Sequence, residues 1–244
     1  MNTSVPPRML LDAASAYYRA AGRFAWHFAR AKLRADPAYR LILEQGLLAH
    51  RRHLLDLGAG QGLLAAWLLA ARSCHALGEP VAWPAGWPAP PLLESYTGIE
   101  INPKEVRRAR RAFALDVGAR VRLLHADIRD ADFGRPDAIV LLDVLHYNDF
   151  TAQERILGRA RSALAPGGAL LVRIGDAAGG QAFTLSKALD QGVALVRRGR
   201  WLPLHCRTLT NWQTLLAGLG FSTRTVAVSR GTAFTNTLLI GKAA

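Results

Sequence analysis

Three glycines at alternate positions, Gly58, Gly60 and Gly62, follow a short apolar run with one acid, Asp56, in the stretch LLDLGAGQG. This pattern predicts a buried strand that turns sharply into a helix, because glycine tolerates positive φ and has no Cβ to keep a ligand from the backbone. The N-terminus of the following helix favours a carboxylate or a phosphate. The stretch therefore predicts a turn that holds a bound cofactor.

Two familiar phosphate-binding turns fit this stretch poorly. The third glycine of a dinucleotide fingerprint would fall at Leu63, and the Gly-Lys-Ser/Thr ending of a phosphate-cradling loop is absent. Asp56 would repel a pyrophosphate, whereas its carboxylate can pair with an ammonium group. The turn therefore favours a cofactor with an ammonium group over NAD or a nucleoside triphosphate.

The elements around this turn alternate regularly along the chain. Strands are predicted at residues 53–57, 96–101, 121–125, 137–142 and 169–174, with helices at 60–71, 103–116 and 152–164. Alternating strands and helices predict the α/β class, with a doubly wound, mostly parallel, Rossmann-like sheet. Two late segments, 222–228 and 236–240, complete seven strands as a C-terminal β-hairpin. Ligands bind at the carboxyl ends of strands in such a sheet, so the candidate residues are those at the strand ends.

Five stretches in chain order resemble the successive motifs of class I S-adenosylmethionine-dependent methyltransferases, in particular the type 11/12-like members. They are LLDLGAGQG (54–62), TGIEINP (97–103), LLHADIRD (123–130), DAIVLLDVLHY (137–147) and LAPGGALLVRIGD (164–176). Together they cover roughly residues 50 to 180. The resemblance implies S-adenosyl-L-methionine as the cofactor and methyl transfer as the reaction.

The resemblance also implies which residues bind the cofactor. They lie in the glycine turn, at the ends of the later strands and in the N-terminal helix: Asp56, Gly58, Ala59, Gly60, Gly62, Glu100, Ile101, Asp127, Ile128, Asp143, Val144 and Tyr17. Asp56 is expected near the ammonium group and Glu100 at the ribose hydroxyls, while Asp127 with the Ile128 backbone meets the adenine edge. Tyr17 is expected at the carboxylate, with a packed core aromatic as the alternative.

The methyl acceptor is less well defined by the residues. Methyl transfer needs an aligned nucleophile and, for some acceptors, a base, and His146 is the candidate general base because imidazole titrates near neutral pH. The stretch Asp143–Tyr147 lacks the prolines typical of enzymes that methylate base amino groups, and it resembles the loop of enzymes acting on small molecules. O-, C- and N-methylation all stay open, and no metal is required.

A weaker resemblance concerns the stretch RFAWHFARAKLRADPAYR, which is similar to the front end of methyltransferases from bacterial aryl polyene and pigment pathways. It implies an aromatic or polyketide-like acyl acceptor, free or bound to a carrier protein. Two alternatives remain: an RNA or protein methyltransferase that uses the basic surface, and a non-catalytic module that binds S-adenosylmethionine.

The chain is expected to form an N-terminal helical cap, residues 1–50, followed by a methyltransferase domain, residues 51–244. The cap is predicted to contain one helix from about residue 13 to residue 34. A segment rich in Trp and Pro, about 77–95, interrupts the alternation and predicts an irregular surface loop, with a lid or docking loop as the alternative.

The composition of the chain limits its possible binding partners and its cellular compartment. The formal net charge is +13, which permits nucleic acid, anionic membrane or acidic protein as a partner, and biased base composition explains it equally well. Nucleic acid is not favoured because no separate RNA-binding module is visible. Two cysteines and no apolar leader predict a cytoplasmic protein, with peripheral contact to an anionic membrane as an option. The oligomeric state stays open.

Overall fold

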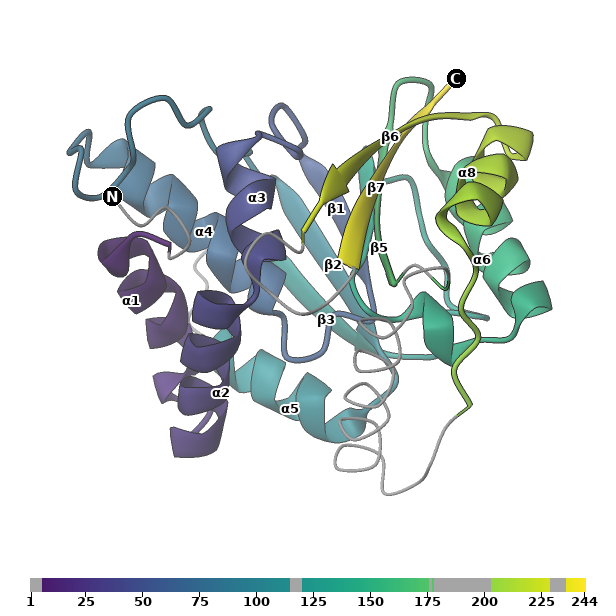
Figure 1. Cartoon of the computed structure of the whole chain (residues 1–244). Helices are drawn as coiled ribbons and strands as arrows, with labels where there is room; N and C mark the ends of the chain where they lie inside the picture. Colours follow the sequence, from purple (N-terminus) through teal and green to yellow (C-terminus); the bar gives the residue numbers. More distant parts are fainter. Residues whose placement is uncertain (1–5, 115–119, 176, 178–202, 229–235) are drawn as a thin grey trace. The chain divides into compact units, whose positions relative to one another are not determined.

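The computed structural model describes residues 6–114, 120–175, 177, 203–228 and 236–244 (Figure 1). The chain divides into two compact units, Met1–Asp127 and Ile128–Ala244. Asp116 and Asp176, which end a predicted helix and the last predicted motif, lie outside the described residues.

The first unit contains a parallel three-stranded segment of sheet. Its strands are β1 (His53–Leu57), β2 (Ser95–Glu100) and β3 (Val121–His125), with β2 between the other two. The register aligns Asp56 with Gly98 and Glu100 with His125. Two helices follow the strands, α4 (Leu63–Ala76) and α5 (Pro103–Ala112), and Pro103 begins α5 behind the Asn102 cap. The predicted positions of these elements are confirmed to within a few residues.

The helices before β1 also belong to the first unit. They are α1 (Arg8–Ala16), the 3₁₀ turn η1 (Tyr17–Arg19), α2 (Arg23–Ala35) and α3 (Pro37–Glu44). The single helix predicted from residue 13 to residue 34 is wrong, because Gly22 adopts φ of 103° and separates η1 from α2. Both α1 and α2 contact α4 (Figure 1), so the N-terminal helices cover the helix that follows the glycine turn.

The Trp/Pro-rich segment packs against the first unit rather than leaving it. Trp83 is buried, its ring meets His75 at 5.5 Å between centroids, and it meets Trp87 edge-on at 5.4 Å. A Cβ on Gly46 would lie 3.0 Å from Pro88. His75 is in the last turn of α4, about 20 Å along the helix from the glycine turn at a rise of 1.5 Å per residue. This packing gives Trp83 a structural role and favours neither a lid nor a docking loop.

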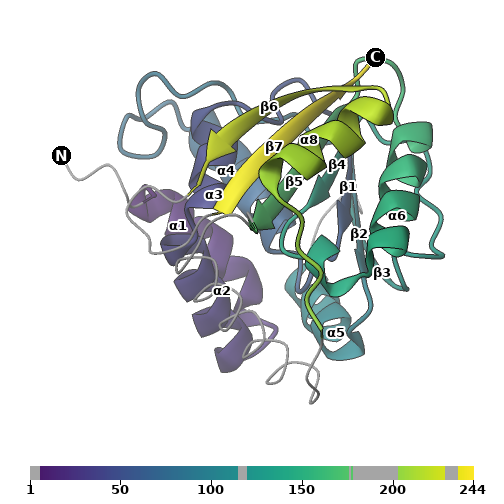
Figure 2. The ribbon, with the colours of Figure 1, turned by 45° about the vertical axis from the view of Figure 1, so that its right-hand side comes forward.

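The second unit contains the remaining four strands. They are β4 (Ala138–Leu141), β5 (Ala169–Gly175), β6 (Phe221–Ala227) and β7 (Asn236–Ala243), with helices α6 (Phe150–Ala163) and α8 (Leu209–Gly218) and the 3₁₀ turn η2 (Leu145–Tyr147). Strand β7 is antiparallel to both β5 and β6 and lies between them, as Figure 2 shows. The pair β6–β7 is the predicted hairpin.

The strand order is β3-β2-β1 in the first unit and β4-β5-β7-β6 in the second, seven strands in all. The five described pairings confirm the predicted mixture, because the three between β1 and β2, β2 and β3, and β4 and β5 are parallel and the two made by β7 are antiparallel. Among the described residues, no helix is long and apolar enough to cross a membrane.

Candidate functional site

The glycine turn has the conformation that its sequence requires. Gly58, Gly60 and Gly62 all have positive φ, at 80°, 57° and 76°. The N–H groups of Gly58 and Ala59 donate to the Ile99 carbonyl oxygen at 2.8 and 3.0 Å, which fixes the turn against β2. A Cβ built on Gly60 would meet no heavy atom within 4 Å, so the backbone faces open space there.

Asp56 lies at the end of β1 with 4% of its surface exposed. The Tyr96 hydroxyl donates a hydrogen bond to its carboxylate. The pKa of Asp56 is raised from 3.8 to about 7: burial is the largest cause, the Tyr96 hydrogen bond opposes it, and the negative charge of Glu100 adds to it. The carboxyl group is thus ready to gain a cationic partner, because a nearby positive charge would restore its ionised form.

Glu100 is held directly against the glycine turn. Its Oε2 accepts the Gly60 N–H at 2.9 Å, and its Oε1 accepts the Asn102 N–H at 2.7 Å. The carboxylate is thereby fixed at the end of β2, although about 40 residues separate it from the turn. The inserted segment precedes β2, so it lengthens the chain without moving Glu100 away from β1.

The turn also contacts the N-terminal helices. Tyr18 is fully buried and its hydroxyl donates to the Gln61 carbonyl oxygen at 2.9 Å. Tyr17 is half-buried and its ring lies 5.5 Å from that of Phe113. A Cβ on Gly62 would come within 2.9 Å of the Phe113 ring. Tyr17 and Tyr18 therefore pack at the glycine turn, and a cofactor contact by Tyr17 stays a prediction.

Three further predicted residues lie at strand ends. Ile101 is 43% exposed directly after β2, and Asp127 is half-buried two residues after β3. Ile128 is buried in the second unit, where its carbonyl oxygen accepts from Arg159 at 3.1 Å. The adenine contacts of Asp127 and Ile128 and the cofactor contact of Ile101 stay predictions.

The predicted Asp143 of the second unit pairs with a buried arginine. Arg173, on β5, is 4% exposed, and its Nε and Nη2 both donate to the Asp143 carboxylate. Asp143 itself has positive φ, 57°, which is uncommon for a residue with a side chain. Val144 follows it, half-buried. The arginine compensates the charge of Asp143, and this ion pair joins the loop after β4 to β5.

His146 lies in η2 on a loop held by several hydrogen bonds. Gln153, fully buried on α6, donates through Nε2 to the carbonyl oxygens of Leu145, Asn148 and His205, at 3.2, 2.9 and 2.8 Å. The His205 N–H donates to the His146 carbonyl oxygen at 2.9 Å. The loop with the candidate base is therefore tied to both α6 and the segment before α8.

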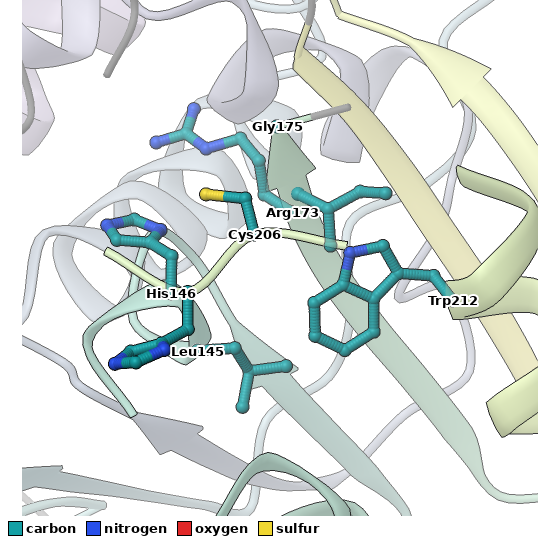
Figure 3. Close-up of a pocket in the computed structure, with 8 residues that line it drawn as sticks. Leu145, His146, Arg173, Gly175, Cys206 and Trp212 are labelled. Atoms are coloured by element: carbon teal, nitrogen blue, oxygen red, sulfur yellow. The ribbon is translucent and has the colours of Figure 1, made fainter. Parts of the chain in front are cut away.

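A small pocket lies beside this loop. Its lining includes His146, Arg173, His205, Cys206 and Trp212, and Figure 3 shows His146, Cys206 and Trp212 around it. The indole N–H of Trp212 is buried and has no hydrogen-bond acceptor within the described residues. The candidate base of the second unit therefore lies beside a small cavity with several polar groups in its lining.

Sequence reasoning missed Tyr96, Arg173 and Gln153. An arginine inside the apolar strand ALLVRIG was visible, because a charge there needs a buried partner. Tyr96 lies two residues before Gly98, the register partner of Asp56, so it shares a sheet face with that position. Gln153 gave no comparable signal, because a glutamine on a helix is usually exposed.

Comparison with known proteins identifies the class. Residues 55–170 match a family model described as a methyltransferase domain. Over this stretch, just under half of its length, the chain resembles a methyltransferase domain. The predicted family and fold are thereby confirmed, and S-adenosylmethionine is the methyl donor of this class.

Individual relatives of the methyltransferase domain are distant. A carboxy-S-adenosyl-L-methionine synthase from Chromohalobacter salexigens is 29% identical over 146 residues, which are 57% of this chain and 48% of that protein. An O-methyltransferase family protein from Burkholderia thailandensis superposes with a TM-score of 0.64 at 22% identity, over all of this chain and 65% of that one. This chain thus spans about half the length of the former relative and about two thirds of the latter.

A third similar protein matches along its whole length. Magnesium protoporphyrin IX methyltransferase from Synechocystis PCC 6803, with S-adenosylhomocysteine (SAH) bound, has a TM-score of 0.59 at 16% identity, over 98% of both chains. At such identity the likeness concerns the fold of the methyltransferase domain.

Proposed function

We propose that this protein transfers a methyl group from S-adenosylmethionine to a small-molecule acceptor. The observation that carries the proposal is the arrangement at the glycine turn, where two buried carboxyl groups, Asp56 and Glu100, flank a backbone that is open at Gly60. These groups fit a cofactor that combines an ammonium group with vicinal hydroxyls, and the match to a methyltransferase domain supports that cofactor.

The residues of the first unit supply complementary charge and space. Asp56 pairs with the α-ammonium group, Glu100 accepts from the ribose hydroxyls through its remaining lone pairs, and Gly58, Ala59 and Gly60 allow close approach to the backbone. Glu100 arrives preorganised because two N–H groups already fix its orientation. When bound, the cofactor supplies an activated methyl group.

The acceptor is proposed to be an aromatic or acyl compound that loses a proton to His146. The loop of His146 is held on both sides by Gln153 and the His205 N–H, which limits the positions the imidazole can take. Support for a small acceptor comes from the structural relatives, one of the O-methyltransferase family and one named for magnesium protoporphyrin IX.

Calorimetry with SAH tests the cofactor site. The wild type is expected to bind it, and Asp56→Ala and Glu100→Ala should each weaken binding by about 1–3 kcal/mol, because each removes a hydrogen-bonding partner of a charged or polar group. Glu79→Ala is the matched control, since Glu79 is an exposed carboxylate of the Trp/Pro-rich segment. Unchanged affinity in both site variants would contradict the assignment.

Product analysis tests the reaction. The protein is incubated with S-adenosylmethionine and phenolic or acyl acceptors, free or attached to a carrier protein, and the products are identified by mass. One methylated acceptor with stoichiometric SAH supports methyl transfer. A changed mass of the cofactor itself would point to a reaction like that named for the Chromohalobacter relative and would replace this proposal.

A further inference from the structure

Helices α2 and α5 of the first unit present an unusual run of basic side chains. Helix α2, RFAWHFARAKLRA, contains no acidic residue, and α5, PKEVRRARRA, contains only Glu105, which is 6% exposed. Together they carry nine Arg and Lys residues: Arg23, Arg30, Lys32, Arg34, Lys104, Arg107, Arg108, Arg110 and Arg111. No exposed acid interrupts this set on either helix.

Acids elsewhere neutralise only part of this charge. Arg30 pairs with Asp12, Lys32 with Asp36, and Arg108 with Glu105. The exposed side chains that have no acidic partner within the described part of the chain are Arg23, Arg34, Lys104, Arg107, Arg110 and Arg111. The surface therefore keeps a local excess of positive charge.

The spacing on α5 concentrates this charge on one side. Lys104, Arg107, Arg108 and Arg111 follow the i, i+3, i+4, i+7 pattern and so share one face of the helix. Arg108 reaches α2, where its guanidinium lies 4.5 Å from the centroid of the Phe24 ring. This contact joins the two helices, which lie near each other in Figure 1, into one surface, here called the α2–α5 face.

Two aromatic rings lie within the α2–α5 face. Phe24 is 64% exposed, and its ring stacks on that of Phe28 with centroids 6.2 Å apart and an angle of 9° between the planes. Arg108 covers one side of the Phe24 ring, so the ring is braced in its exposed position. Leaving the Phe24 ring in water is unfavourable, and a partner that covers the ring would remove this cost.

We propose that the α2–α5 face docks on an anionic lipid surface. Basic side chains near such a surface each gain about a factor of five in binding, and aromatic side chains enter the headgroup region. The basic side chains without an acidic partner are distributed over two helices, and mobile lipid headgroups can pair with each of them separately. This docking does not depend on the proposed reaction.

Cosedimentation with vesicles tests the docking. The full chain is expected to sediment with phosphatidylcholine vesicles that contain about one third phosphatidylglycerol, to stay in solution with phosphatidylcholine alone, and to be released by high salt. Arg107→Glu with Arg111→Glu should lower the partition coefficient at least about 30-fold, and Phe24→Ser should lower it several-fold at unchanged charge.

The matched control separates this face from the overall charge of +13. Arg135→Glu with Arg224→Glu makes the same charge change at exposed positions of the second unit and should leave sedimentation within about two-fold of the wild type. An equal loss in the control, or no sedimentation of the wild type, would overturn the proposal. If the wild type bound polyuridylate but not vesicles, and Phe24→Ser bound polyuridylate equally well, the face would be assigned to nucleic acid instead.

The variants are checked for folding by SAH calorimetry, since none of the changed residues contacts the glycine turn. Retained SAH affinity with lost vesicle binding supports the docking surface alone. Vesicle binding without any SAH affinity would leave the docking standing and refute the cofactor site.

Discussion

Replacing Asp56 by Asn should stabilise the protein, and increasingly so as the pH rises. The wild-type carboxyl group has a pKa of about 7 in the folded protein, whereas an aspartate exposed to water in the unfolded chain has a pKa of 3.8. At a pH between these two pKa values, the Asp56 carboxyl group keeps its proton in the folded chain and has released it in the unfolded chain. The free energy of unfolding therefore falls with rising pH at about 1.4 kcal/mol per pH unit in this window, and it levels off above the folded pKa.

The size of the effect follows from the width of that window. When the pH rises from about 5 to about 8.5, roughly two pH units of this range lie below the folded pKa of Asp56. The free energy of unfolding of the wild type therefore falls by about 3 kcal/mol, and that of Asp56→Asn does not show this fall. Asn cannot ionise, and its side-chain oxygen still accepts from the Tyr96 hydroxyl. All other titrating groups are shared by the two proteins and cancel in the difference.

Urea unfolding followed by tryptophan fluorescence at the two pH values measures this difference. The stability advantage of Asp56→Asn should grow by about 3 kcal/mol from the lower to the higher pH, while the exposed Glu79→Gln should show no such growth. A constant difference between wild type and Asp56→Asn would show that the buried carboxyl group ionises as freely as an exposed one, and the electrostatic reasoning would fail.

Four further outcomes are expected. SAH should bind about ten-fold more tightly at about pH 8 than at about pH 6, with proton release visible in buffers of different ionisation enthalpy, because Asp56 must ionise to meet an ammonium group; equal affinity would mean no such pairing. Gly98→Ala should lower stability by about 1–3 kcal/mol, since its Cβ would lie 2.8 Å from that of Ala59 and 2.7 Å from Leu123, as chemical denaturation would show. Gln153→Leu should cost about 2–4 kcal/mol by removing the donor to the buried carbonyl oxygens of Asn148 and His205, and a thermal midpoint unchanged from wild type would refute that. His146→Gln should reduce turnover at least about 100-fold with SAH affinity retained; full activity in a methyl-transfer assay would remove His146 as the base.

The sequence predicted the arrangement around the glycine turn because local rules determine it. Strand periodicity located β1 and β2, and their parallel register alone places Glu100 beside a turn about 40 residues earlier. Glycine's positive φ follows from the same steric argument at Gly58, Gly60 and Gly62.

Other features depend on contacts between distant segments and could not be read from patterns. Gly22 lies within a stretch whose apolar periodicity predicts one continuous helix, and its φ of 103° ends the first helical segment before α2 begins. The burial of Trp83 depends on His75 and on Trp87, which the proline content obscured. Arg173 and Asp143 are 30 residues apart, and only the folded second unit brings their charges together.

The position of β7 has a consequence for how the second unit assembles. Strand β7 follows β6 in the chain but lies between β5 and β6, so β7 is the only partner of β6 among the described strands of that unit. During synthesis on the ribosome, β6 must wait with its backbone groups unpaired while the residues of β7 emerge. A nascent chain stopped before Asn236 should therefore be open to proteases at β6 and become resistant once Ala243 has left the exit tunnel.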